Sequence, residues 1–203
     1  FLPEKPYSSY GTGETKMEVT ADGTVYILSQ FKDEFNDESV RLWKIGQGGK
    51  VDETILYKEE GAISTVFVQD LAINEAGDVF CAVLTSTSTG TGYKDESHIL
   101  KNGIELRKFE VGMFEANMAV SGNDVYFVYS NFDRSELYYY KNSDHLFTLK
   151  GGTMWIGDYH SLVVSSAGDI YSVVRGDREA WIYKNQTAIY YRNSYLNNIW
   201  FVE

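Results

Sequence analysis

The stretch Ala119-Val-Ser-Gly-Asn-Asp-Val-Tyr-Phe-Val128 decides the fold, because three other parts of the chain are versions of it. Each version is a short apolar strand, a tight turn that contains Gly or Asn, and a second strand that opens with Val or Ile and an aromatic residue. Asn-Asp and Gly-Asp turns suit the positive φ angles of a two-residue hairpin, so the element is predicted to be a β-hairpin. The other versions occupy 19–28, 72–81 and 163–172.

A second pattern gives the register of a longer repeat. After each hairpin, a third strand ends in an aromatic or aliphatic residue, a Lys and a turn: W-K-I-G at 43–46, L-K-N-G at 100–103, Y-K-N-S at 140–143 and Y-K-N-Q at 183–186. Turns of the Asn-Gly kind predict a second tight hairpin that leads into a fourth strand. Successive copies are about 45 to 54 residues apart, and four-stranded units at roughly this spacing are typical of propeller blades.

The sequence therefore predicts an all-β fold, a β-propeller with four four-stranded antiparallel blades. We expect an N-terminal entry segment at 1–15, followed by repeats at about 16–60, 61–110, 111–150 and 151–203. An apolar piece at 199–202 is predicted to close the ring by joining the first blade. The alternatives are half of an eight-bladed ring made by two chains, or part of a larger propeller.

Composition excludes several classes of protein. Aromatic residues make up 15% of the 203 residues, and both prolines lie within the first six positions, which suits pleated sheets. A net charge of −11 with no basic patch argues against binding to nucleic acid or to an anionic membrane surface. No apolar run approaches the ~20 residues of a membrane span. Cys81 is the single cysteine, so an internal disulfide is excluded and a buried structural role is expected.

The pairing of S-G-N-D-V-Y at 121–126 with Y-x-K-N at 139–142 resembles a repeat of many uncharacterised bacterial β-propeller proteins, and L-K-N-G at 100–103 fits the same repeat. The resemblance covers 16–203, and the first copy, with D-G-T at 22–24, departs from it most. It implies a bacterial protein of unassigned function that acts outside the cytoplasm, in the periplasm, at the cell surface or secreted. A chain that begins at Phe1 without Met is compatible with processing during export.

Long connections are expected at two places in each repeat: between the second and third strands, as at 86–97, and between the fourth strand and the next repeat, as at 59–69 and 110–116. In a propeller both emerge on the same face, and variable loops on a rigid scaffold are where binding sites usually lie. A short polar side chain recurs just ahead of the first strand. These residues, Asp70, Asn117, Ser161 and Asn198, are predicted to ring the mouth of the central channel.

Aromatic residues accompany the predicted polar ring, among them Trp155, Tyr159 and Tyr195, and Asp158 lies in the same connection as the first two. Aromatic faces beside amides and carboxylates can hold sugars and other flat, hydroxylated ligands. The alternative is that the polar residues cap strand ends and that the aromatic residues pack between blades. The sequence thus predicts a non-enzymatic binding or scaffold module for a glycan or a protein surface, and it allows a homodimer.

Two further functions remain open at this point. The motifs G-x-S-x-G, H-E-x-x-H and C-x-x-C are absent from the sequence, so an enzyme is the less favoured reading. His98 and His145 are expected to be solvated on outer strands, whereas His160 lies beside Asp158 in a predicted binding loop. A hydrolase or lyase at that pair is one alternative, and a purely structural segment of a surface assembly is the other.

The acidic stretch K-D-E-F-N-D-E at 32–38 is the best candidate for a metal site in the sequence. It has the oxygen ligands that Ca²⁺ prefers, but it lacks the spacing of an EF-hand loop. We therefore expect a solvated loop, with no cofactor and no assigned metal ligand.

Overall fold

The computed structural model describes residues 15–33, 37–59, 64–110, 114–131, 133–152, 154–156, 161–176 and 179–193. In these ranges the chain forms antiparallel strands and no helix, which confirms the predicted all-β class. The chain divides into two compact units, Phe1–Gly112 and Met113–Glu203, and each unit contains two sheets. No helix long and apolar enough to cross a membrane occurs in these ranges. The predicted closing strand at 199–202 lies outside them.

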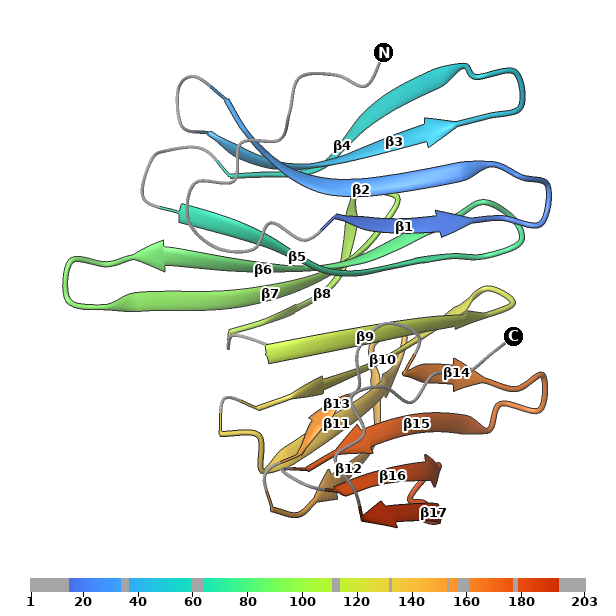
Figure 1. Cartoon of the computed structure of the whole chain (residues 1–203). Coiled ribbons are helices and arrows are strands. Elements are labelled where there is room, and N and C mark those ends of the chain that lie inside the picture. Colours follow the sequence, from blue (N-terminus) through green and yellow to red (C-terminus); the bar gives the residue numbers. More distant parts are fainter. Residues whose placement is uncertain are drawn as a thin grey trace. The chain divides into compact units, whose positions relative to one another are not determined.

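The first unit contains two four-stranded sheets, each with its strands in sequence order (Figure 1). Sheet A consists of β1 (Lys16–Val19), β2 (Val25–Lys32), β3 (Glu38–Ile45) and β4 (Val51–Glu59). Sheet B consists of β5 (Ser64–Ile73), β6 (Val79–Ser88), β7 (Tyr93–Lys101) and β8 (Ile104–Phe109). Each sheet is therefore a meander of the kind that the repeat pattern predicts.

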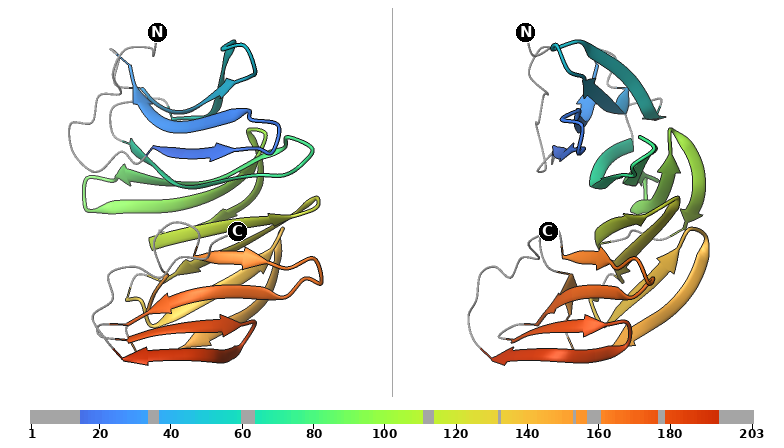
Figure 2. Two further views of the ribbon diagram at one scale, coloured as in Figure 1. Left: turned by 45° about the vertical axis from the view of Figure 1, so that its right-hand side comes forward. Right: turned by 90° about the vertical axis from the view of Figure 1, so that its right-hand side faces the viewer.

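The second unit repeats this arrangement, and both views of Figure 2 show consecutive strands side by side within each sheet. Sheet C consists of β9 (Phe114–Ser121), β10 (Asp124–Ser130), β11 (Glu136–Lys141) and β12 (Asp144–Lys150). Sheet D consists of β13 (Trp155–Ile156), β14 (Leu162–Val164), β15 (Ile170–Arg175), β16 (Glu179–Lys184) and β17 (Thr187–Asn193). In sheet D, β13 and β14 both pair with β15 and so share the place that one strand fills elsewhere.

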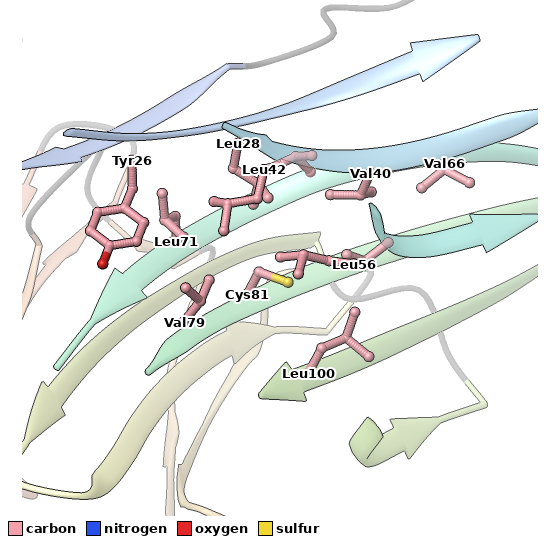
Figure 3. Close-up of a cluster of buried hydrophobic side chains, with 12 residues drawn as sticks. Tyr26, Leu28, Val40, Leu42, Leu56, Val66, Leu71, Val79, Cys81 and Leu100 are labelled. Carbon is pink, nitrogen blue, oxygen red and sulfur yellow. The ribbon is translucent and has the colours of Figure 1, made fainter. Parts of the chain in front are cut away.

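The core of the first unit lies between sheets A and B (Figure 3). Because side chains alternate across a strand, β2 places Tyr26 and Leu28 on one face, and these pack against Val79 and Cys81 of β6. All four side chains are buried. Cys81 is thus a buried core residue, as predicted, and burial raises the pKa of its thiol to about 12.

The second unit uses the same rule of packing. Tyr126 and Val128 of sheet C, which correspond by position to Tyr26 and Leu28, pack against Ile170 and Val174 of sheet D. We call the face with the Tyr26 or Tyr126 position the forward face of a sheet, and the opposite face its rear face. In both units, the forward face of one sheet covers the rear face of the next sheet in the chain.

An Asp–Lys–Asn cluster joins the two tight hairpins within a sheet. In sheet C, Asn142 has a φ of 53°, and its side chain accepts a hydrogen bond from the Val125 N–H (3.1 Å) and donates one to Asp124 (2.8 Å). Lys141 Nζ lies 2.7 Å from the second oxygen of Asp124 and 5.6 Å from the centre of the Tyr126 ring. The cluster explains why D-V-Y and K-N occur together in a repeat.

The cluster recurs in two other sheets, with the same partners at similar distances. Its members are Asp78, Lys101 and Asn102 in sheet B, and Asp169, Lys184 and Asn185 in sheet D. Sheet A has Thr24 and Ile45 where the others have Asp and Asn, and it keeps only Lys44, 5.4 Å from the centre of the Tyr26 ring. This loss agrees with the divergence of the first repeat in sequence.

These clusters predict a loss of stability in acid. Hydrogen bonds from Lys and then Asn lower the pKa of the Asp78, Asp124 and Asp169 carboxyls below the ordinary value of 3.8. Because the folded pKa is depressed, the stabilisation is complete above the ordinary value and is lost as the pH falls through the folded value. We expect the free energy of unfolding, measured by urea denaturation, to be level near pH 6 and to fall below about pH 4.

The matched control replaces all three carboxyls with amides, as Asp78→Asn, Asp124→Asn and Asp169→Asn together. This variant should be less stable at pH 6, and its stability should depend less on pH between about 5 and 3. Some dependence should remain, because the pKa values of Glu96 and Glu136 are also lowered. An unchanged slope in the triple variant would show that the clusters do not contribute.

The connections are shorter than predicted. The segment expected as a loop at 86–97 is mostly strand, because β6 extends to Ser88 and β7 begins at Tyr93. Strands β5 and β9 likewise begin inside the loops predicted at 59–69 and 110–116. The cause in β5 is a bulge between Val68 and Asp70, which shifts the alternation of apolar residues while the ladder continues. The apolar pattern therefore changes phase within one strand.

Candidate functional site

Two residues of the predicted polar ring, Asp70 and Asn117, occupy one register position on the first strand of their sheets. Asp70 lies opposite Ala82 and three residues before Ile73, which pairs with Val79. Asn117 lies opposite Val128 and three residues before Val120, which pairs with Val125. Both residues lie within their strands and not ahead of them as predicted, because β5 and β9 are longer than expected. The two residues therefore hold equivalent positions, as predicted, but they lie within strands and not in the connections ahead of them.

In the second unit, two of the predicted residues contact one another. The Ser161 hydroxyl donates a hydrogen bond to Oδ1 of Asn117 over 2.8 Å, and the Ser161 carbonyl accepts one from the Val173 N–H. Ser161 is fully buried, and Asn117 is half-buried. The contact joins sheet C to sheet D.

In the first unit, the same register position on β1 is occupied by Lys16, which was not among the predicted site residues. Lys16 on β1 lies opposite Leu28, three residues before the pair of Val19 with Val25. It is buried, and β1 packs beside β5, which carries Asp70. Lys16 precedes Val19 by three residues, as Asp70, Asn117 and Ser161 precede Ile73, Val120 and Val164. The equivalence can therefore be read from the sequence once the four hairpins are aligned.

Several predicted site residues cannot be placed. Those outside the described ranges are Asp158, Tyr159, His160, Tyr195 and Asn198. The backbone of Trp155 lies in β13 opposite Arg175. Their roles in ligand binding or catalysis stay predictions.

The acidic stretch at 32–38 is not simply a solvated loop. Glu38 is buried, and its carboxylate accepts hydrogen bonds from the Val66 N–H (2.6 Å) and from Gln30 Nε2 (2.9 Å). Lys32 Nζ lies 3.3 Å from the other carboxylate oxygen. Glu38 therefore ties sheet A to sheet B through protein partners. No group of three or more His, Cys, Asp or Glu side chains that could hold a metal ion occurs among the residues that the structure describes.

The expectation that His98 is solvated is wrong. His98 lies buried on β7, where Nδ1 is 2.7 Å from the Glu105 carboxylate and Nε2 is 3.3 Å from the Tyr57 hydroxyl of sheet A. The Tyr57 hydroxyl donates to Glu59 over 2.6 Å. Tyr57 is 41 residues away in sequence, so no local sequence pattern could predict the contact. His145, in contrast, is exposed on β12, as expected.

The hydrogen bonds around His98 restrict where its protons lie. Because the single proton of the Tyr57 hydroxyl is directed to Glu59, its oxygen can only accept from His98 Nε2. Burial and the neighbouring Glu59 raise the pKa of the Tyr57 hydroxyl, which keeps it a donor. The cluster binds sheet A to sheet B.

The β6–β7 hairpin extends past the last strand of its sheet. Strand β8 ends at Phe109 opposite Ser97, so residues 93–96 pair with β6 alone. Tyr93, the first residue of β7, is 78% exposed. The end of the hairpin reads T-S-T-S-T-G-T-G-Y at 85–93, a run of hydroxyl residues and Gly that leads to one aromatic side chain.

Charged side chains brace the base of this hairpin. The Glu96 carboxylate lies 2.7 Å from Lys94 Nζ and 2.8 Å from Lys108 Nζ of the adjacent β8. Hydrogen bonds from Lys108 and Lys94 lower the pKa of Glu96 to about 2. The carboxylate is therefore ionised at neutral pH and holds two strands together. A hairpin that is paired with β5 on one side and braced by these ion pairs on the other can present Tyr93 in a defined position.

Comparisons with known proteins give no family. No family model matches the chain, and no curated protein matches it. Among solved structures, the chain is similar to a glucose dehydrogenase at 9% identity and a TM-score of 0.42, covering 85% of this chain and 81% of that one. It is also similar to BBS1N, solved in complex with ARL6DN, at 8% identity and a TM-score of 0.35, covering 88% and 77%. At these scores neither likeness bears on fold or function.

Proposed function

We propose that the protein is a non-enzymatic binding module that acts outside the cytoplasm and recognises a protein surface, with Tyr93 as its anchoring side chain. The observation that carries the proposal is the exposure of Tyr93, 78%, at the end of a hairpin that extends past β8, the last strand of its sheet. Tyr supplies a large, rigid and amphipathic contact, and Ser, Thr and Gly beside it supply adaptable hydrogen bonds. This mixture is typical of surfaces that bind proteins.

The arrangement of the scaffold supports the same proposal. The hairpin connects the second and third strands of its repeat, which in a propeller lies on the same face as the connections between repeats. Further contacts from that face would add to a single aromatic anchor, because linked contacts raise affinity together. A four-bladed β-propeller closed by residues 199–202 is the form of the scaffold that we propose.

The proposal is tested with two variants, each of which replaces one exposed large side chain with Ser. Tyr93→Ser removes the anchor. Ile104→Ser changes a side chain of similar exposure, 71%, on β8, where Ile104 pairs with Lys101 at the other end of β7 from Tyr93. Partners are first captured from the host with the unchanged chain and then measured one at a time. We expect Tyr93→Ser to weaken binding about 10- to 100-fold, as at an interface hot spot, and Ile104→Ser to leave it unchanged.

A glycan is the alternative ligand, since sugars also stack on exposed aromatic rings. A glycan array probed with the same three proteins separates the two classes of ligand. Binding on the array that is lost in Tyr93→Ser would replace the protein partner with a glycan. Equal binding by both variants would reject Tyr93 as the anchor.

A further inference from the structure

Strand β7 has an open edge beside Tyr93. Residues 93–96 pair with β6 on one side, and β5 pairs with the far side of β6. On the other side, β8 ends at Phe109 opposite Ser97, so no described residue of sheet B pairs there with 93–96. All of these strands belong to one sheet of the first unit. Backbone groups at such an edge form a template to which another strand can pair.

The backbone groups that face this edge belong to Tyr93 and Asp95. In an antiparallel ladder, successive residues direct their N–H and C=O to opposite sides of the strand, and the ladder of β6 with β7 has no register shift. The Glu96 carbonyl faces β6, where it accepts a hydrogen bond from the Thr85 hydroxyl over 3.3 Å. The Asn102 N–H, just past the end of β7, also donates to a carbonyl of β6, over 2.8 Å. Even-numbered residues of β7 therefore face β6, and Tyr93 and Asp95 face the open edge.

The side chains of Tyr93 and Asp95 lie on the same face of the hairpin. Residues two apart on a strand share a face, so Lys94 and Glu96 lie on the other one. The Glu96 carboxylate is neutralised there by Lys94 and Lys108. Among the described residues, no ion pair neutralises the Asp95 carboxylate in this way. The open edge is therefore flanked by one exposed aromatic ring and one uncompensated negative charge.

We propose that the protein partner adds to this edge as an extended strand in the line of β8, with an apolar side chain beside Tyr93 and a Lys or Arg beside Asp95. The inference rests on the proposed function, since the same Tyr93 anchors the partner. In this mode of recognition, backbone hydrogen bonds supply affinity and alternate side chains supply specificity. Aromatic–β-branched pairs and opposite-charge pairs across strands are both stabilising. The net charge of −11 also favours the approach of a basic segment.

The first test is hydrogen exchange of single backbone amides, followed by NMR with a synthetic peptide of three V-T-K-T repeats. Alternation in this peptide places Val and Lys on one face, as the proposed pairing requires. With the peptide at about ten times its dissociation constant, the amides of Tyr93 and Asp95 should exchange about 10-fold more slowly. The amide of Glu96 faces β6 with or without the peptide, so its exchange should not change.

The second test reverses the charge on each side of the pairing. A matched peptide of three V-T-E-T repeats should bind the unchanged chain about 5- to 10-fold more weakly, measured by fluorescence anisotropy at low salt. Asp95→Lys should reverse this preference. Asp144→Lys makes the same change at an exposed position of β12 in the second unit and should leave the preference as it is. Should Asp95→Lys fail to fold, Asp95→Asn removes only the charge and should abolish most of the preference.

The variant Tyr93→Ser separates failure of this inference from failure of the proposed function. If Tyr93→Ser binds the V-T-K-T peptide as tightly as the unchanged chain does, Tyr93 is not the anchor and the proposed function fails. If Tyr93→Ser weakens binding but the peptide does not protect the amides of Tyr93 and Asp95, the anchor stands and strand addition is overturned. Equal affinity for the two peptides, or binding of neither at about millimolar concentration, also overturns strand addition by a basic segment.

Discussion

Glu38→Ala is expected to lower the free energy of unfolding of the first unit by about 3–5 kcal/mol, the cost of breaking a buried charged contact. The buried carboxylate accepts from the Val66 N–H and from Gln30, and pairs with Lys32. Its removal leaves these donors without their acceptor between two packed sheets. The amide hydrogen of Val66, measured by hydrogen exchange, should exchange faster by the same free energy.

The control for Glu38 is Glu53→Ala. Glu53 lies 2.7 Å from Arg41, but both side chains are partly solvated, so we expect a loss below about 1 kcal/mol. Glu38→Gln should lie between the two, because an amide oxygen can still accept from Val66 while the amide nitrogen faces other donors. If Glu38→Ala costs no more than Glu53→Ala, then Glu38 does not hold sheets A and B together.

The second large effect is expected at Asn142. Asn142→Ala should lower the free energy of unfolding by about 2–4 kcal/mol, measured by urea denaturation. One part is the unmade hydrogen bond to the N–H of the buried Val125. The other part is the left-handed backbone, with φ of 53°, which Asn tolerates better than Ala.

Asn142→Gly separates the two parts. Gly adopts the left-handed conformation freely, so this variant should lose only the side-chain hydrogen bonds and cost about 1–3 kcal/mol. Lys141→Met removes the exposed ion pair with Asp124 and should cost less than about 1 kcal/mol. Equal stability of the Ala and Gly variants would show that the backbone angle contributes nothing to the loss. An Asn142→Gly variant as stable as the unchanged chain would show that the side-chain hydrogen bonds contribute nothing.

The hairpins could be predicted from the sequence because their causes are local. A turn of the Gly-Asp or Asn-Gly kind needs only its own residues to adopt positive φ, and Asn102, Asn142 and Asn185 all do so. The repeat spacing then orders the strands into four sheets. The Asp–Lys–Asn cluster was visible in the sequence as two turn motifs, but the hydrogen bonds between them required the pairing of the strands.

The length of β5, the first strand of sheet B, could not be predicted because a bulge interrupts its alternation of apolar residues. In β5, Val66 and Val68 point into the core, and after the bulge Leu71 does so as well. Alternation with a single period breaks at that point, so the first half of the strand was taken for a loop. Asp70 was consequently assigned to a loop mouth, although it lies within the strand.

The polar contacts between sheets were missed because their partners are distant in sequence. His98 meets Tyr57, Glu38 meets Val66, and Ser161 meets Asn117 only when two repeats pack together. A single sequence carries no record of such pairs. The burial of His98 on β7 is equally a property of the packed pair of sheets, since its own strand also carries exposed residues.

The Asp–Lys–Asn cluster has a consequence for how such a chain changes in length. Every partner of the cluster comes from within one repeat, so the turns of a sheet need nothing from its neighbours to form. Unequal recombination that inserts or deletes one whole repeat therefore moves turns whose hydrogen-bond partners all lie within that repeat. The only new packing that is needed is between the forward face of one sheet and the rear face of the next. Lineages built on this unit can differ by entire sheets while each surviving sheet keeps its register.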